Sequence, residues 1–184
     1  MTAQNQPQSD VDVWQTAPER MDAPPGAILR SWLIEPGLLT RRLQQQCGSA
    51  FRLQLVNETH SPASNAHSSD LYRQVALCCG DEPCIYAESR IPLATANAHF
   101  WLRDLGNAPL GERLQNNADV TRGTFVYSRQ AADILPQWIR ATLGADVADI
   151  YARRSCFYLG EHEIEVTEYF LPGVVHCGTT ASQA

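Results

Sequence analysis

The chain has 184 residues, which suits a single domain, and its 14 basic and 20 acidic side chains give a formal net charge of −6. This acidity argues against nucleic acid or an anionic membrane surface as a partner, because both require a basic face. Hydrophobic residues make up 44% of the chain, enough for a core. Because the sequence has neither an apolar run near the ~20 residues that span a bilayer nor a secretory signal pattern, we expect a cytoplasmic protein without stable membrane insertion.

The composition changes along the chain in a way that predicts three parts. Residues 1–23 are polar and show no periodicity, so we expect a flexible arm. Residues 24–173 carry all the predicted helices and strands and form the single domain. Residues 174–184 are mostly small and polar, which predicts a flexible tail.

Helical and strand periodicities alternate within the domain. Apolar residues at helical spacing predict helices, and alternating apolar and polar residues predict strands. The first predicted helix opens at 24–26 and is broken at 35–37. In chain order the further elements are a helix over 38–46, a strand over 51–56, a loop over 59–69, a strand pair at 71–79 and 84–91, helices over 95–105 and 110–116, a strand over 120–128, a helix over 131–143, and a strand pair at 150–159 and 163–171. Because hairpins make antiparallel neighbours, the predicted fold class is α+β, with about five strands in one antiparallel sheet flanked by helices.

Cysteine and histidine positions give no metal-binding pattern. The cysteines are Cys47, Cys78, Cys79, Cys84, Cys156 and Cys177. Their spacing does not match a zinc motif, so we expect reduced thiols that are neither catalytic nor metal ligands. His60 and His67 lie in the predicted loop without Cys or carboxylate partners at ligand spacing, so no metal site is expected there either.

Two charged residues stand on strand faces that are otherwise apolar. Glu168 shares one strand face with the apolar residues at 164, 166 and 170, and Arg73 shares one with those at 71, 75, 77 and 79. A lone buried charge is costly, so each needs a partner or a function. Arg73 and Glu168 could pair with each other. Alternatively, they could line opposite ends of a small closed pocket, where the arginine fork would bind a carboxylate and the glutamate would bind a hydroxyl group or handle a proton.

Well-known catalytic motifs are absent from the sequence. It contains no phosphate-binding loop, no dinucleotide fingerprint, no GxSxG elbow and no HExxH. Nothing in the sequence therefore points to a nucleotide, a metal ion or a covalent nucleophile.

Five sequence blocks, in a fixed order, resemble one enzyme family. They are Ser31-Trp32-Leu33 with 38–43, Tyr72–Cys78 with Glu82-Pro83, Leu105–Gly111, Ala152–Ser155, and Thr167–Pro172. Together they span about residues 28 to 172, and they resemble the bacterial chorismate lyases, also called chorismate–pyruvate lyases or 4-hydroxybenzoate synthases.

The resemblance implies a carbon–oxygen lyase that converts chorismate to 4-hydroxybenzoate and pyruvate for ubiquinone biosynthesis, without metal or organic cofactor. It implies an antiparallel sheet with a buried pocket, inhibition by product, and a monomer that needs only small-molecule partners. The family's active-site Arg and Glu correspond to Arg73 and Glu168. Two further substrate contacts correspond to Leu39 and Leu110, where the backbone N–H group is the donor.

The sequence departs from the family pattern in several places. Glu88 stands where the family has an arginine, and Arg90, two residues on, is a possible secondary substrate-binding residue in its place. Cys84 replaces a tryptophan of the family pattern, and the stretch 129–148 is longer than expected. These departures leave Arg73 and Glu168 intact.

Two other functions remain open at the level of sequence. One is a non-catalytic module that binds small aromatic carboxylates, related to the effector domains of transcription regulators, although residues 1–25 are too short and polar for a DNA-binding segment. The other is a lyase with an altered substrate or product, which Glu88 would motivate.

Overall fold

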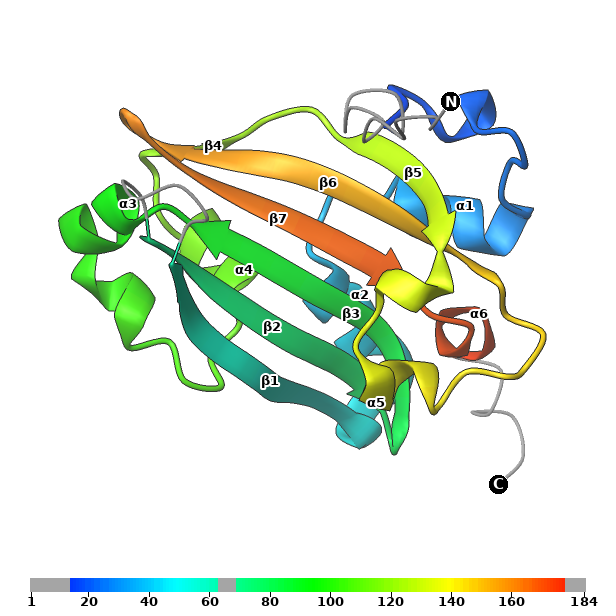
Figure 1. Cartoon of the computed structure of the whole chain (residues 1–184). Helices are drawn as coiled ribbons and strands as arrows, with labels where there is room; N and C mark the ends of the chain where they lie inside the picture. The colour runs from blue at the N-terminus through cyan, green and yellow to red at the C-terminus, as the bar shows by residue number, and fades with distance from the viewer. Residues whose placement is uncertain (1–13, 63–68, 178–184) are drawn as a thin grey trace, which may run out of the picture.

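The computed structural model describes residues 14–62 and 69–177, without the side chains of residues 60–62 and 69. Within these ranges, seven strands form one antiparallel sheet in the order β1-β2-β3-β7-β6-β4, and β5 pairs with β6 next to β4 (Figure 1). The predicted α+β class with a single antiparallel sheet is confirmed.

Two hairpins form the centre of the sheet, as predicted. The strands are β1 (Phe51–Pro62), β2 (Ser69–Cys79), β3 (Glu82–Ile91), β4 (Val120–Arg122), β5 (Val126–Ala131), β6 (Asp149–Leu159) and β7 (His162–Phe170). The predicted loop 59–69 is wrong at both ends, where β1 and β2 continue their ladder, while residues 63–68 lie outside the described ranges. The predicted strand 120–128 is in fact two strands, because the chain leaves the ladder at Gly123.

Two of the helices are clearly shorter than the sequence suggests, and α6 was not predicted. The helices are α1 (Ala27–Leu33), α2 (Leu39–Cys47), α3 (Leu93–Ala98), α4 (Leu110–Gln115), α5 (Gln137–Arg140) and α6 (Gly173–His176). The helix predicted over 95–105 ends at Ala98, and a separate 3-10 turn follows. The helix predicted over 131–143 is interrupted at Pro136, which lacks the backbone N–H that a helix interior needs.

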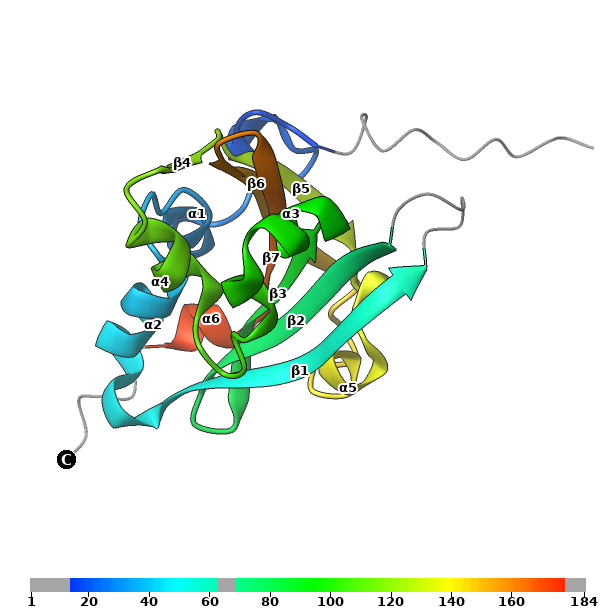
Figure 2. The same ribbon diagram turned by 90° about the vertical axis from the view of Figure 1, so that its left-hand side faces the viewer.

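Helices cover both faces of the sheet. Figure 2 shows α1, α2 and α4 on one side and α5 on the other. Leucines of α2 and α4 belong to two apolar clusters that share the face of Arg73 and Glu168, while Ile139 of α5 packs with Tyr86 and Tyr169 on the opposite face. The two charged residues identified from the sequence, Arg73 and Glu168, therefore lie on the face of the sheet that α2 and α4 cover.

The chain near both termini is more ordered than predicted. Gln15 pairs with Tyr127 at the edge of the sheet, and Met21 is buried in the core, so the flexible-arm prediction is wrong for residues 14–23. Val174 of α6 is also buried, which contradicts a tail that starts at residue 174. Residues 1–13 and 178–184 lie outside the described ranges.

The prediction of six reduced cysteines is wrong for one pair. Cys47 at the end of α2 and Cys79 at the end of β2 form a disulfide, because the helix packs beside the β1–β2 end of the sheet. The side chains of His60 and His67 lie outside the described residues. Over 14–62 and 69–177, no helix is long and apolar enough to cross a membrane.

Candidate active site

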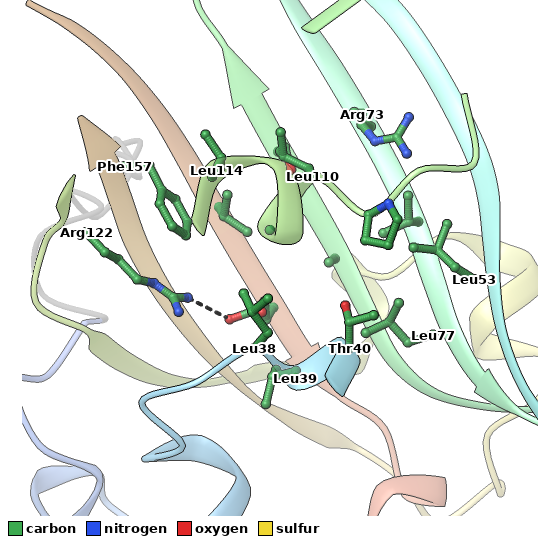
Figure 3. A pocket seen from close by; sticks show the side chains of 17 residues that line it. Leu38, Leu39, Thr40, Leu53, Arg73, Leu77, Leu110, Leu114, Arg122 and Phe157 are labelled. Atoms are coloured by element: carbon green, nitrogen blue, oxygen red, sulfur yellow. Dashed lines mark hydrogen bonds and ion pairs between the residues drawn. The ribbon is translucent and has the colours of Figure 1, made fainter. Parts of the chain in front are cut away.

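A cavity of about 70 Å³ lies between the sheet and helices α2 and α4 (Figure 3). Its apolar walls include Leu38, Leu39, Leu53, Val75, Leu77, Leu110, Leu114, Phe157 and Val166. Its polar lining includes Arg73, Ser89, Arg122 and Glu168. The two residues that break the apolar pattern of their strands therefore line one cavity.

The middle strand, β3, leaves room between these two charges. Arg73 on β2 lies opposite Ser89, and Glu168 on β7 lies opposite Ala87. Because Ala87 and Ser89 are small, no side chain of β3 fills the space between the neighbouring strands. A flat ligand can therefore lie across β3 with one end near Arg73 and the other near Glu168.

Arg73 is 1% exposed, and its guanidinium group makes three hydrogen bonds. Its Nη1 donates to Oε2 of Glu58 at 3.0 Å, and its Nη2 donates to the carbonyl oxygens of Gly106 and Ala108 at 2.8 and 3.0 Å. Arg73 thus both lines the cavity and holds the loop that leads into α4. Glu58 was not predicted as a site residue, because the predicted strand ended at residue 56 and Glu58 could not be assigned to a face of the sheet.

Glu168 has different partners at the other end of the cavity. Its Oε2 accepts a hydrogen bond from Nε of Arg153 at 2.6 Å and lies 3.5 Å from Nη2 of Arg122. The possibility that Arg73 and Glu168 pair with each other is therefore wrong, because each has its own partners. These two guanidinium groups stabilise the negative charge of the Glu168 carboxylate.

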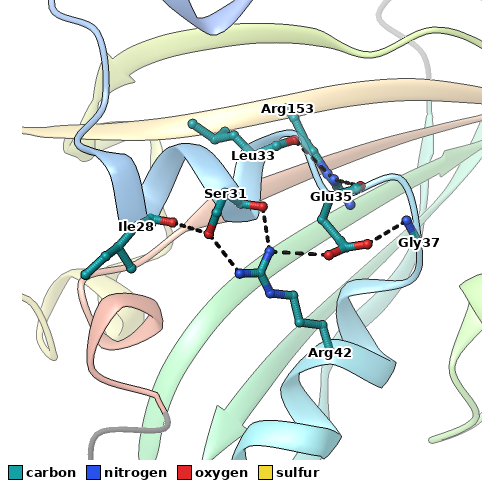
Figure 4. A network of polar contacts seen from close by, with 7 residues as sticks. All are labelled: Ile28, Ser31, Leu33, Glu35, Gly37, Arg42 and Arg153. Atoms are coloured by element: carbon teal, nitrogen blue, oxygen red, sulfur yellow. Dashed lines mark hydrogen bonds and ion pairs between the residues drawn. The ribbon is translucent and has the colours of Figure 1, made fainter.

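Arg153 links Glu168 to the turn between α1 and α2, and Figure 4 shows its contacts with that turn. This fully buried arginine donates from Nη1 to the carbonyl oxygens of Leu33 and Glu35, at 3.2 and 2.6 Å. The same turn leads to Leu38 and Leu39, which line the cavity. One arginine thereby fixes both the glutamate and the backbone that faces it.

A second arginine braces the same turn from the α2 side. Arg42 donates to the backbone and hydroxyl oxygens of Ser31, and its Nη1 lies 3.3 Å from Oε2 of Glu35 (Figure 4). The other carboxylate oxygen of Glu35 accepts the N–H of Gly37 at 3.0 Å. The cavity wall formed by this turn is therefore held by several polar contacts rather than by apolar packing alone.

Arg122, on β4, lies at the end of the cavity away from Arg73 in Figure 3. Its guanidinium carbon stands 4.2 Å from the ring centre of Phe125 and 4.8 Å from that of Phe157, and its Nε donates to Oγ of Ser155 at 2.9 Å. Burial lowers the pKa of Arg122 to about 10, and Glu168 opposes that shift, so the group remains positively charged at neutral pH. The sequence analysis missed it, because the predicted strand 120–128 hid the break that turns Arg122 inward.

Leu39 and Leu110 are the first residues of α2 and α4, and both line the cavity. The first N–H groups of a helix have no partner within it. The first residues of α2 and α4 therefore place backbone N–H donors at the two positions that the family resemblance implies.

Arg90 lies away from this cavity. It alternates with Ser89 along β3, so it points to the opposite face, where its Nε donates to Oδ2 of Asp70 at 2.7 Å. Glu88 shares that face and accepts hydrogen bonds from Gln74 and Tyr86 at 2.9 and 2.7 Å. A substrate-binding role for Arg90 stays a prediction.

Fold and site together define an α+β protein with a mostly apolar cavity between the sheet and two helices, lined by the charged side chains of Arg73, Arg122 and Glu168. The chorismate lyase family model matches residues 9–177, and the chain belongs to that family. The predicted family membership is therefore confirmed. The predicted enzyme class, a carbon–oxygen lyase, is confirmed at the level of the family.

Curated relatives carry the same name. A "Probable chorismate pyruvate-lyase" from Dechloromonas aromatica is 35% identical over 158 residues, covering 80% of this chain and 88% of the relative. One from Pseudoalteromonas translucida is 30% identical over 151 residues, covering 78% and 84%. Among solved structures, a GntR-family transcriptional regulator from Bacillus cereus aligns with a TM-score of 0.45 at 13% identity, over 68% of this chain and 94% of that one.

Proposed function

We propose that the chain eliminates pyruvate from chorismate to give 4-hydroxybenzoate. The observation that carries this proposal is the pair of charged residues, Arg73 and Glu168, held at two ends of one apolar cavity. Chorismate has a carboxylate on ring carbon C1 and a hydroxyl group on C4, directly across the ring. The cavity therefore offers a cation at one end of the ring and a hydrogen-bond acceptor at the other.

The reaction balances without an external reactant. The bond from C3 to the enolpyruvyl ether oxygen breaks, C4 loses its hydrogen, and the methylene carbon of the leaving group gains a hydrogen to become the methyl group of pyruvate. The ring becomes aromatic, which makes the elimination favourable and redox-neutral. The protein then has to position the substrate and exclude water rather than form a covalent intermediate.

Arg73 binds the ring carboxylate in this proposal. Its contacts with Glu58 and the two carbonyl oxygens use three of the five guanidinium N–H groups, so two remain for a substrate. The backbone N–H groups of Leu39 and Leu110 supply further donors. At the other end, the Glu168 carboxylate accepts a hydrogen bond from the C4 hydroxyl group.

Arg122 binds the second carboxylate of chorismate, which belongs to the enolpyruvyl group on C3, next to C4. The Arg73 end is formally neutral, since Arg73 faces Glu58 (+1 − 1 = 0). The Glu168 end carries a formal charge of +1, since Arg153 and Arg122 both face Glu168 (+1 + 1 − 1 = +1). An unbalanced cation beside the C4 site is what the enolpyruvyl carboxylate requires, and the product no longer has that carboxylate.

The product fits the same cavity closely. A flat hydroxybenzoate retains the groups that Arg73 and Glu168 bind, and apolar walls favour an aromatic ring. We therefore propose that product release is slow and that 4-hydroxybenzoate inhibits the enzyme. We also propose the biosynthetic role that the family resemblance implies, supply of the ubiquinone ring in the cytoplasm.

Direct product analysis tests the function. Purified protein is mixed with chorismate, ultraviolet absorbance is followed, and chromatography identifies the products. We expect 4-hydroxybenzoate and pyruvate in equal amounts. Intact chorismate together with tight 4-hydroxybenzoate binding would instead favour the non-catalytic binding module, and a different aromatic product would favour an altered lyase.

A further inference from the structure

Four cysteines from separate parts of the chain meet at one end of the sheet. Cys47 ends α2, Cys79 ends β2, Cys84 lies in β3, and Cys177 follows α6. The Sγ atoms of Cys47, Cys79 and Cys177 all lie within 4.8 Å of one another, and Sγ of Cys84 is 3.0 Å from Sγ of Cys177. We call these four residues the thiol cluster.

We propose that the thiol cluster, with the Cys47–Cys79 bond reduced, binds one Zn²⁺ ion through four thiolates. Zinc binds four cysteine sulfurs in a tetrahedron with Zn–S distances of about 2.3 Å, which places the sulfurs about 3.8 Å apart. The sulfurs of Cys47, Cys79 and Cys177 lie within 4.8 Å of one another, and the sulfur of Cys84 joins them through its 3.0 Å contact with Cys177. Binding then requires the sulfurs of the Cys47–Cys79 and Cys84–Cys177 pairs to separate toward the tetrahedral spacing.

Local sequence supports the same site. Cys79 and Cys84 flank the turn of the β2–β3 hairpin with four residues between them, the longest of the two- to four-residue spacings of structural zinc sites. The prediction that the cysteine spacing matches no zinc motif therefore does not hold for this pair. Gly80 has a φ of +63°, the conformation that lets the chain turn back so tightly. A hairpin that presents two cysteines, completed by cysteines from two other elements, is a common construction of such sites.

A structural disulfide alone does not account for the cluster. The Cys47–Cys79 bond uses two sulfurs, yet Cys84 and Cys177 place two free thiols against it. Cys84 is also completely buried. The gathering of four sulfurs in a largely apolar region is explained by a thiolate site, which needs all of them.

The chemistry of loading is balanced. A phosphine reductant supplies two electrons to the Cys47–Cys79 bond, and one water molecule supplies the oxygen of the phosphine oxide and the hydrogens of the two thiols. Zn²⁺ then displaces four thiol protons without changing its oxidation state. The bound ion would crosslink α2, the β2–β3 hairpin and the segment after α6, and α2 also carries Leu39 of the cavity wall.

Cobalt substitution tests the proposal on the full chain. The protein is reduced with a phosphine, titrated anaerobically with Co²⁺, and then with Zn²⁺. We expect one Co²⁺ per chain, with the thiolate charge-transfer and intense visible bands of a tetrahedral sulfur site, displaced by Zn²⁺. Cys177→Ser should weaken Co²⁺ binding by more than about 100-fold. Losing a residue that only hydrogen-bonds to a metal ligand usually costs 10- to 100-fold in affinity, and Cys177 is a ligand itself.

Two controls keep the test decisive. Cys156→Ser, on β6 and outside the thiol cluster, should bind Co²⁺ like the reduced wild type, and unreduced wild type should not show the thiolate bands. Circular dichroism confirms that each variant is folded. Reduced wild type without thiolate–cobalt bands, or Cys177→Ser binding as tightly as wild type, would overturn the proposal.

Discussion

The two ends of the cavity are built differently, although each centres on one charged residue. At the first end, Arg73 faces one carboxylate, that of Glu58, and two backbone carbonyl oxygens. At the second end, Glu168 faces the guanidinium groups of Arg153 and Arg122. The first end is electrically balanced and the second has an excess positive charge, so an anionic substrate with two carboxylates can be held with a defined orientation.

The surroundings also differ in what they hold in place. Arg73 fixes the loop before α4, whereas Arg153 fixes the turn before α2. Each end of the cavity is therefore coupled to the helix start that closes it. A mutation at either end should alter both the charge and the position of one wall, and the predictions below separate these effects.

Removing the guanidinium group of Arg73, at the electrically balanced end of the cavity, should lower activity most. Arg73→Ala should lower kcat/KM by about 10²- to 10³-fold, the range expected when one partner of a buried, hydrogen-bonded charge pair is truncated. Arg73→Lys should restore only part of the activity, since it lacks the planar fork. Steady-state kinetics beside thermal melting separate catalysis from folding, and near-normal kcat/KM in the alanine variant would refute a role for Arg73 in substrate binding.

At the other end of the cavity, replacing Glu168 by glutamine should reduce activity less than replacing it by alanine. If Glu168 only positions the C4 hydroxyl group, Glu168→Gln should lower kcat by about tenfold, since an amide oxygen still accepts a hydrogen bond. If it transfers a proton, the loss should be about 10²- to 10⁴-fold and should equal that of Glu168→Ala. We expect the milder outcome, because aromatisation of the ring already makes the elimination favourable and leaves positioning of the hydroxyl group as the task of Glu168. Measuring kcat and 4-hydroxybenzoate affinity for both variants distinguishes the two roles.

Arg122, which gives the Glu168 end its excess positive charge, should contribute to the binding of chorismate but not to that of 4-hydroxybenzoate. Arg122→Gln should raise KM for chorismate by about 10- to 100-fold, the loss expected for a hydrogen bond between charged groups. Its affinity for 4-hydroxybenzoate should stay within about threefold of wild type, because the product lacks the second carboxylate. Isothermal titration with the product and initial rates with chorismate give both numbers, and equal losses for the two ligands would show that Arg122 does not recognise the enolpyruvyl group.

Arg90 provides the matched control on the opposite face. Arg90→Gln removes a half-buried ion pair with Asp70 on the face of the sheet opposite the cavity, so we expect KM within about twofold of wild type. Kinetics at several salt concentrations complete the test. A clear rise in KM, or a weaker salt dependence of substrate capture, would instead give Arg90 the substrate-capturing role inferred from the family pattern.

The strand faces explain what the sequence could predict. Alternation along β2 and β7 places Arg73 and Glu168 on one face, and a charge on an apolar face is visible without a structure. The fold class followed from hairpins joined by short turns, which are local signals. The same alternation along β6 could have identified Arg153, which shares a face with Phe157, but the adjacent Arg154 obscured which arginine points inward.

What the sequence could not predict depends on distant contacts. Arg122 faces the cavity only because the chain breaks at Gly123 and forms two short strands against β6. Cys47 and Cys79 are 32 residues apart, and their pairing depends on where α2 packs. Neither result follows from local periodicity.

A structure with bound 4-hydroxybenzoate shows directly which end of the cavity binds the ring carboxylate. We expect the carboxylate of the ligand within hydrogen-bond distance of Arg73, its hydroxyl group donating to Glu168, and no direct contact with Arg122. A ligand in the reverse orientation, with its carboxylate on Arg122, or one bound outside the cavity, would refute the proposed roles of Arg73 and Glu168.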